Sequence, residues 1–257
     1  MDPPSHEGGH LTVPHATATP AQPFAIREAV IRAQCVVLDL DGPVARLFAR
    51  EPAHEVARQM LCLARDDGRL ADGVRDPADP IAVLHAHTDR MRRLGHDPGW
   101  RTTVEALHDL LDSYERKAAE SAEPTPYAAD FIRACHASGR TLAIATNNHA
   151  DAAVRIIERM GVRDCFDGPV VGRTGDATLM KPHPRALLAA MSRGVPAGRH
   201  LMIGDTVSDF RAARQIEMPF CGYHRHVRGR QRLLDAGVPY AASEMGEFLE
   251  FVADTDR

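Results

Sequence analysis

The chain has 257 residues, of which 44% are apolar, and a formal net charge of −4. This length suits one large domain, or one core with an insertion, and the apolar content suffices for a hydrophobic core. The small negative charge predicts no nucleic acid and no membrane surface as a partner. No apolar run is long enough to span a bilayer, and the N-terminus lacks the apolar segment of a secretory signal. Five cysteines without close pairing favour a reducing, cytoplasmic location over a disulfide framework.

The chain begins with a polar stretch that leads into a short apolar one. Residues 1–24 are rich in Pro, His, Gly, Ala and Thr, so they are predicted to form a flexible tail. Residues 25–33 have helical spacing. Cys35–Leu38 is then an apolar run typical of a buried parallel strand.

Two carboxylates follow this strand. Asp39 and Asp41 are two residues apart and therefore point the same way at the strand end, and Gly42-Pro43 then turns the chain. Like charges this close repel unless a cation lies between them or one takes a proton, and Mg²⁺ meets the first condition. Taken alone, the pattern fits a surface turn with two solvated carboxylates equally well.

Residues 45–123 have a different pattern, with amphipathic helices predicted at Glu51–Ala64, Pro80–Leu94 and Thr102–Ala119. Turns rich in Asp, Gly and Pro separate them, and no strand-like run occurs. This part is predicted to be a helical domain inserted directly after the first strand.

From residue 124 short apolar strands alternate with helices, which predicts an α/β fold with a doubly wound, Rossmann-like, largely parallel sheet. The core domain is therefore assigned to residues 25–44 and 124–257. Its further strands are expected at Thr141–Ala145, Gly168–Gly172, His200–Ile203, Pro219–Gly222 and Val238–Ala241.

Polar side chains follow three of these strands. They are Asp39 and Asp41, then Thr146 and Asn147, then Asp205 with Asp209 one helical turn later, and Lys181 lies on a loop between the last two groups. Ligands of such sheets bind beyond the carboxyl ends of the strands. This inventory suits an oxyanion held between a divalent metal and a lysine, with a carboxylate positioned to attack it.

The ordered set Asp39-Leu40-Asp41-Gly42, Thr146, Lys181 and Gly204-Asp205-x-x-x-Asp209 resembles the four motifs of the haloacid dehalogenase (HAD) superfamily of hydrolases. The helical insertion is similar to the C1-type cap of the phosphoglycolate phosphatase and beta-phosphoglucomutase branch. Pro43 departs from the threonine that many members carry there, without touching a catalytic role.

The resemblance implies catalytic roles for Asp39, Asp41, Thr146 and Lys181. Asp39 would be the nucleophile that forms an aspartyl-phosphate, and Asp41 the general acid and then the base. Thr146, Asn147, Lys181 and Gly42 would bind the phosphoryl group. Mg²⁺ would be held by the Asp39 carboxylate, the Asp41 carbonyl and Asp205, with Asp209 in its outer shell.

The activity expected from this resemblance is Mg²⁺-dependent hydrolysis of a small phosphorylated metabolite by a monomer or homodimer. Two alternatives stay open, a sugar phosphomutase of the same branch and a non-catalytic protein that binds a phospho-ligand. Arg46 is equally compatible with a substrate contact and with a solvated position. The basic segment His224–Arg232 is expected to be a solvated loop, the alternative being a contact with a second anionic group of the substrate.

Overall fold

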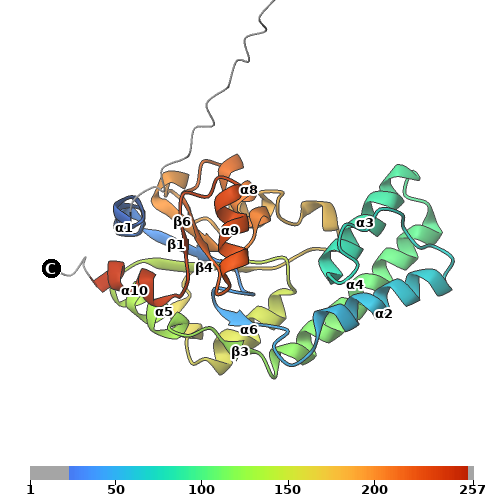
Figure 1. Ribbon diagram of the computed structural model, residues 1–257, viewed down its shortest axis with the longest axis horizontal. Coiled ribbons are helices and arrows are strands. Elements are labelled where there is room, and N and C mark those ends of the chain that lie inside the picture. The colour runs from blue at the N-terminus through green and yellow to red at the C-terminus, as the bar shows by residue number, and fades with distance from the viewer. Residues whose placement is uncertain (1–22, 254–257) are drawn as a thin grey trace, which may run out of the picture.

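The computed structural model describes residues 23–253 of the chain. In it a parallel sheet lies between two layers of helices, and a lobe of three long helices extends to one side (Figure 1). Residues 1–22 of the predicted tail lie outside the described residues, whereas Pro23 and Phe24 belong to the first helix.

The elements of the first half, in chain order, are α1 (Pro23–Arg32), β1 (Cys35–Leu38), β2 (Ala45–Arg46), α2 (Ala53–Asp66), α3 (Pro80–Arg93), α4 (Pro98–Ala119), β3 (Glu123–Pro124), α5 (Ala128–Ala137) and β4 (Thr141–Ala145). Those of the second half are α6 (Ala150–Arg159), η1 (Arg163–Cys165), β5 (Val170–Val171), η2 (Ala177–Leu179), α7 (Arg185–Ala190), η3 (Ala197–Arg199), β6 (His200–Gly204), α8 (Val207–Gln215), β7 (Phe220–Tyr223), α9 (Val227–Asp235), β8 (Ala241–Ala242) and α10 (Gly246–Ala253).

The main sheet has six strands in the order β5-β4-β1-β6-β7-β8, and every neighbouring pair is parallel. The predicted doubly wound α/β fold with a helical insertion after the first strand is therefore confirmed. β1 lies between β4 and β6, and Leu38 is level with Ile144 and Ile203 in the register. The residues that follow these three strands consequently emerge together at the carboxyl edge of the sheet.

Alternate residues of β1 enter different hydrophobic clusters, as the period of a strand requires. Val36 and Leu38 pack with side chains of α1, α5, α6 and α10, whereas Val37 packs with side chains of α7 and α8. Burial on both faces explains why the strand has an uninterrupted apolar sequence.

The helices α2, α3 and α4 form the helical lobe and share a third cluster, which contains Met60, Leu84 and Leu107. Asp79 and Asp97 cap α3 and α4, each accepting a hydrogen bond from a backbone amide of the first turn, and a proline follows each cap. This capping explains why α4 begins before the predicted Thr102. The cluster also includes Ala177 and Met180 from the sheet-bearing part of the chain.

The prediction that residues 45–123 contain no strand was wrong. β2 and β3 pair antiparallel at the two ends of the insertion and form the connecting ribbon between the lobe and the sheet. A strand of two residues is too short to show a period in the sequence. In addition, Arg46 and Glu123 form an ion pair across the ribbon.

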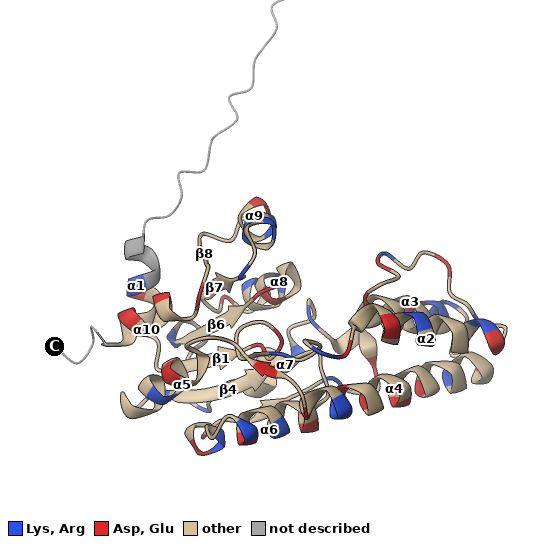
Figure 2. Ribbon diagram, turned by 60° about the horizontal axis from the view of Figure 1, so that its bottom comes forward, with Lys and Arg blue, Asp and Glu red and all other residues tan. Residues whose placement is uncertain are grey.

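The expectation of a loop at His224–Arg232 was also wrong, because α9 begins at Val227. Its buried residues Gly229 and Leu233 are one turn apart, but the surrounding charges hide this short apolar face in the sequence. Among the described residues, none of the helices has both the length and the apolar character that crossing a membrane requires. Charges of both signs are interspersed along α2, α4 and α6 (Figure 2).

Candidate active site at the carboxyl edge of the sheet

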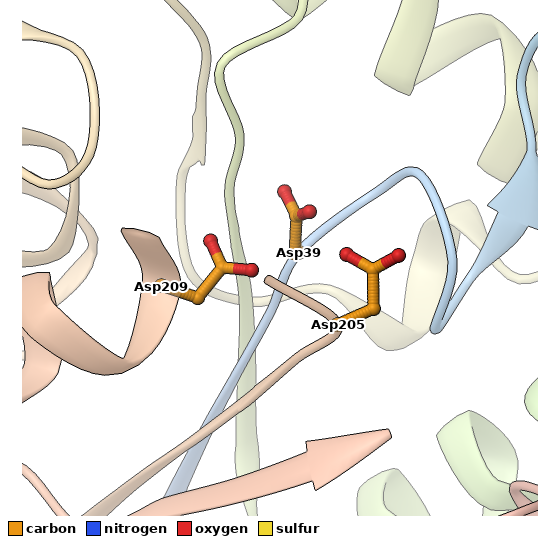
Figure 3. A group of neighbouring side chains, drawn as sticks. All are labelled: Asp39, Asp205 and Asp209. Carbon is orange, nitrogen blue, oxygen red and sulfur yellow. The ribbon is translucent and has the colours of Figure 1, made fainter. Parts of the chain in front are cut away.

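Three carboxylates meet at the carboxyl edge. Asp39 follows β1, Asp205 follows β6 and Asp209 lies in the first turn of α8, and one oxygen from each lies within 4.8 Å of the others (Figure 3). Asp39 and Asp209 are buried. Burial raises the pKa of the Asp39 and Asp205 carboxyls; repulsion among the carboxylates adds to the shift and the Lys181 ammonium opposes it.

Lys181 lies beside two of these carboxylates with only 2% of its surface exposed. Its Nζ donates to Asp39 Oδ1 at 2.8 Å and to the carbonyl of Ala145 at 2.8 Å, and lies 2.6 Å from Asp209 Oδ1. Although burial opposes the charged form, Asp209 and Asp39 raise the pKa of Lys181 above its usual value. The lysine is therefore a fixed ammonium. Asp209 also accepts from Thr206 in the capping box of α8, so it holds Lys181 in place.

Gly42 allows the close approach of Asp205. Its φ is +114°, and a Cβ added to it would lie 2.6 Å from Asp205 Cγ. Its amide already donates to the carbonyl of Ala45 and its carbonyl accepts from Thr125. The residue therefore shapes the turn, and its predicted phosphate contact would compete with the Ala45 bond.

We expect Gly42→Ala to lower both stability and activity, because the methyl group displaces Asp205 in addition to straining the backbone. Strain of this kind costs about 1–3 kcal/mol. Gly139→Ala is the matched control, since Gly139 has φ +77° and no heavy atom lies within 4 Å of an added Cβ. Denaturant unfolding and activity assays should show a stability loss in both variants but an activity loss only in Gly42→Ala. Equal activity in the two variants would contradict this role.

Thr146 and Asn147 follow β4, as predicted. The Thr146 hydroxyl donates to Asn148 Oδ1 at 3.0 Å and accepts from the Asn148 amide. Asn147 instead holds the backbone of Lys181, because its Oδ1 accepts from the Lys181 amide and its Nδ2 donates to the Lys181 carbonyl. The two loops that carry Thr146 and Lys181 are thereby joined. His149 caps α6 by accepting from the Asp151 amide.

The site contains a buried acid that the sequence analysis missed. Glu115 of α4 has no exposed surface and accepts from Asn148 Nδ2 at 2.9 Å and from the His149 amide at 2.7 Å. Arg173, which follows β5, donates to Glu115 Oε2 at 2.6 Å and also pairs with Asp112. A chain of hydrogen bonds therefore runs from the helical lobe through Asn148 to Thr146.

A signal for this acid was present in the sequence. Glu115 continues the spacing of Leu107 and Leu111 on the buried face of α4, at intervals of one helical turn. Its partner Arg173 has no comparable signal, because the ion pair joins residues 58 positions apart.

Asp41 lies apart from the three clustered carboxylates. Its Oδ1 accepts from the Leu47 amide at 2.9 Å. Burial raises its pKa to about 6, and the nearby carboxylates Asp39 and Glu115 add to the shift. A carboxyl group with such a pKa can exchange a proton near neutral pH.

The chemistry of the cluster suits a hard divalent cation. Asp205 Oδ1 is buried and has no hydrogen-bond partner among the described residues. A cation beside it and Asp39 would oppose the repulsion among the carboxylates. Neutral or soft ligands such as His and Cys are missing from this cluster of described residues, which disfavours zinc. Asp39 and Asp205 are thus the candidate metal ligands.

Similarity to known proteins supports the motif resemblance. Residues 33–217 match the model of the haloacid dehalogenase-like hydrolase family. A phosphoglycolate phosphatase of Salmonella typhi is 32% identical over 121 residues, which cover 46% of this chain and 47% of the relative. The match thus spans about half the length of that relative. A phosphoglycolate phosphatase of Thiobacillus denitrificans is 27% identical over 214 residues, which cover 81% of this chain and 92% of the relative.

Solved structures show the same fold. The crystal structure of CbbY from Rhodobacter sphaeroides in complex with phosphate has a TM-score of 0.57 and 20% identity, covering 88% of this chain and 100% of that one. A HAD-superfamily hydrolase from Ehrlichia chaffeensis has a TM-score of 0.53 and 16% identity, covering 88% of this chain and 98% of that one.

Fold and site together define an α/β protein whose carboxylates and buried lysine meet beyond the carboxyl ends of a parallel sheet. The chain belongs to the haloacid dehalogenase-like hydrolase family.

Proposed function

We propose that the chain is a Mg²⁺-dependent phosphatase that hydrolyses a small phosphomonoester through an aspartyl-phosphate on Asp39. The observation that carries the proposal is the buried ammonium of Lys181, which touches Asp39 and Asp209 beside the unpartnered Asp205 oxygen. Fixed positive charge and oriented donors are what phosphoryl transfer needs most. Relatives named phosphoglycolate phosphatase favour 2-phosphoglycolate as the first substrate to test.

In the first step, a carboxylate oxygen of Asp39 attacks phosphorus and the bond from phosphorus to the leaving oxygen breaks. Lys181 would hold Asp39 and balance the phosphoryl charge, and Thr146 would turn its hydroxyl from Asn148 to a phosphoryl oxygen. Asp41, in its protonated form, gives its proton to the leaving oxygen. The alcohol then departs, and Asp39 carries the phosphoryl group.

In the second step, Asp41 takes a proton from a water molecule, which attacks phosphorus and releases phosphate and free Asp39. Mg²⁺ held by Asp39, Asp205 and the Asp41 carbonyl would supply positive charge to the phosphoryl oxygens throughout. The helical lobe, residues 45–123, would act as a cap that keeps bulk water from the intermediate, with residues 25–44 and 124–257 as the catalytic core.

The test is phosphate release from a panel of small phosphomonoesters, headed by 2-phosphoglycolate, with Mg²⁺ and with EDTA. We expect release that depends on Mg²⁺ and stops on chelation. Absence of phosphate release from every ester would disprove the phosphatase proposal. A bisphosphorylated sugar that is isomerised without net phosphate release would instead establish the phosphomutase alternative.

A pH dependence follows from the raised pKa of Asp41, which is about 6. The first step requires protonated Asp41, so kcat/KM should fall as the pH rises through the pKa that Asp41 has in the metal-bound enzyme. In Asp41→Asn this alkaline limb should be lost along with most of the activity. The measurement is kcat/KM for 2-phosphoglycolate between acidic and mildly alkaline pH. An unchanged alkaline limb in Asp41→Asn would assign the titration to another group.

A cytoplasmic location, a small phosphorylated metabolite as partner and a monomeric or homodimeric state complete the proposal. All five cysteines are free, which is consistent with a reducing compartment.

A further inference from the structure

Two cavities meet at Asp41, Asp205 and Phe48, which line both of them. One, of about 240 Å³, lies against the helical lobe and contains Asp39, Thr146 and Lys181; it is called the lobe-side cavity. The other, of about 330 Å³, lies beside the connecting ribbon and the turn between β7 and α9; it is called the ribbon-side cavity. A substrate whose leaving oxygen lies at Asp41 could extend into either one.

The lobe-side cavity offers no free cation to a second anion. Beyond the motif residues, the lobe contributes the carboxylates of Asp79 and Glu115 together with apolar side chains such as Ile81 and Leu111. Lys181 is the one lysine or arginine among the described residues that line it, and its ammonium already contacts two carboxylates. Glu115 is already paired with Arg173, so a carboxylate or second phosphate placed here would meet the Asp79 carboxylate and no free cation.

The ribbon-side cavity has the opposite character. Arg46, His224, Arg225 and His226 line it. The Arg46 guanidinium is paired with Glu123. The Arg225 guanidinium has no hydrogen bond or ion pair with any of the described residues. Arg225 shares the lining of this cavity with Asp41 and Asp205 at its catalytic end.

The backbone that carries Arg225 is fixed by its surroundings. Arg230 of α9 donates to the carbonyls of His224 at 3.1 Å and Arg225 at 3.4 Å. The His226 amide donates to His224 Nδ1 at 3.1 Å, and the His224 ring packs where a side chain at Gly229 would lie. Because the backbone of this turn is already fixed, less conformational entropy is lost when Arg225 binds a ligand than if the turn were flexible.

We propose that Arg225 binds a second anionic group of the substrate, a carboxylate or a phosphate, in the ribbon-side cavity and so selects phosphomonoesters that carry one. The inference rests on the proposed phosphatase function. It assigns substrate selection to the sheet-bearing part of the chain and the connecting ribbon, and gives the lobe the role of excluding anions from its own side.

The test compares esters that differ in one group: 2-phosphoglycolate, 2-hydroxyethyl phosphate and ethane-1,2-diol bisphosphate. For the wild type we expect kcat/KM to be at least about tenfold higher for an ester with a second anion than for 2-hydroxyethyl phosphate. One hydrogen bond between charged groups contributes enough binding free energy for such a ratio. Whichever anionic ester gains more identifies the group that the site prefers. Arg225→Gln should remove this preference through KM, and Arg225→Lys should retain part of it.

Arg228→Gln is the matched control, because Arg228 is an exposed residue of α9 that lines neither cavity. It should keep both the wild-type preference and the wild-type rate on 2-hydroxyethyl phosphate. Absence of a preference in the wild type, an unchanged preference in Arg225→Gln, or an equal loss on all three esters would overturn the inference.

Failure of the phosphatase proposal can be told apart from failure of the Arg225 inference, because in the former case the wild type would hydrolyse none of the esters. In that event calorimetric titration with 2-phosphoglycolate decides the question. Weaker binding to Arg225→Gln than to Arg228→Gln supports the subsite, and equal binding overturns it.

Discussion

Asp39→Asn is expected to abolish phosphate release while making the metal-free protein more stable. A carboxamide is a poor nucleophile. When several catalytic residues act together, removal of the nucleophile alone reduces kcat by about 10⁴-fold or more. Lys181 would keep its contacts with Asp209 and Ala145, so the site should stay folded. The loss should therefore appear in kcat, measured by phosphate release under saturating Mg²⁺.

The gain in stability has an electrostatic cause. In the metal-free cluster three carboxylates face one ammonium, and the pKa of Asp39 is raised. A raised pKa in the folded state means that ionised Asp39 opposes folding, so wild-type stability should fall as the pH rises through that pKa. Asp39→Asn should be more stable by about 1 kcal/mol, more at neutral pH than in acid.

Denaturant unfolding with and without Mg²⁺ measures this gain. Asp72→Asn, which neutralises an exposed carboxylate outside the site, is the control and should leave stability and activity unchanged. Phosphate release by Asp39→Asn within tenfold of wild type would disprove the assignment of the nucleophile.

Arg173→Met is expected to destabilise the chain by about 3–5 kcal/mol, the usual cost of removing one partner of a buried ion pair. The Arg173 side chain is 2% exposed and that of Glu115 is 0% exposed, so water cannot replace the lost contact. Asp112 would lose the same partner. Because Glu115 also holds Asn148, activity should fall as the orientation of Thr146 is lost.

Equilibrium unfolding in denaturant measures the loss in stability. Arg155→Met is the matched control, because Arg155 joins α6 to Glu120 at the end of α4 through an exposed ion pair. This substitution should lower the free energy of unfolding by less than about 1 kcal/mol. Glu115→Gln/Arg173→Met should be more stable than Arg173→Met alone, because it removes a charge left without a partner. A double variant no more stable than the single one would show that packing, and not charge, causes the effect.

The sequence predicted those parts of the molecule that depend on local pattern. The apolar runs of β1, β4 and β6 and the polar residues after them follow from strand periodicity and the geometry of a parallel sheet. The carboxylate cluster with Lys181 could therefore be located before any coordinates were known. Likewise, the three helices of the lobe follow from their amphipathic spacing.

The rest depends on contacts between distant segments. The ribbon-side cavity joins Arg46 of β2 to Arg225 after β7. The sequence left a substrate contact open for Arg46 and for the basic segment that contains Arg225, but it could not show that the two arginines line one cavity. Glu115 of α4 is buried beside Arg173, which comes to it from the loop after β5. A charged residue looks the same in the sequence whether its side chain is solvated or is buried and paired. Only the tertiary structure distinguishes the two cases.

The third hydrophobic cluster couples the helical lobe to the loop that carries Lys181. Met180 precedes Lys181 directly and packs among the side chains of α2, α3 and α4. Movement of the helical lobe away from the sheet would expose this apolar surface to water and pull on the loop that carries the lysine. In the proposed phosphatase, release of phosphate by such a movement would require Met180 to leave its neighbours, so truncation of this side chain is expected to shorten the residence time of phosphate.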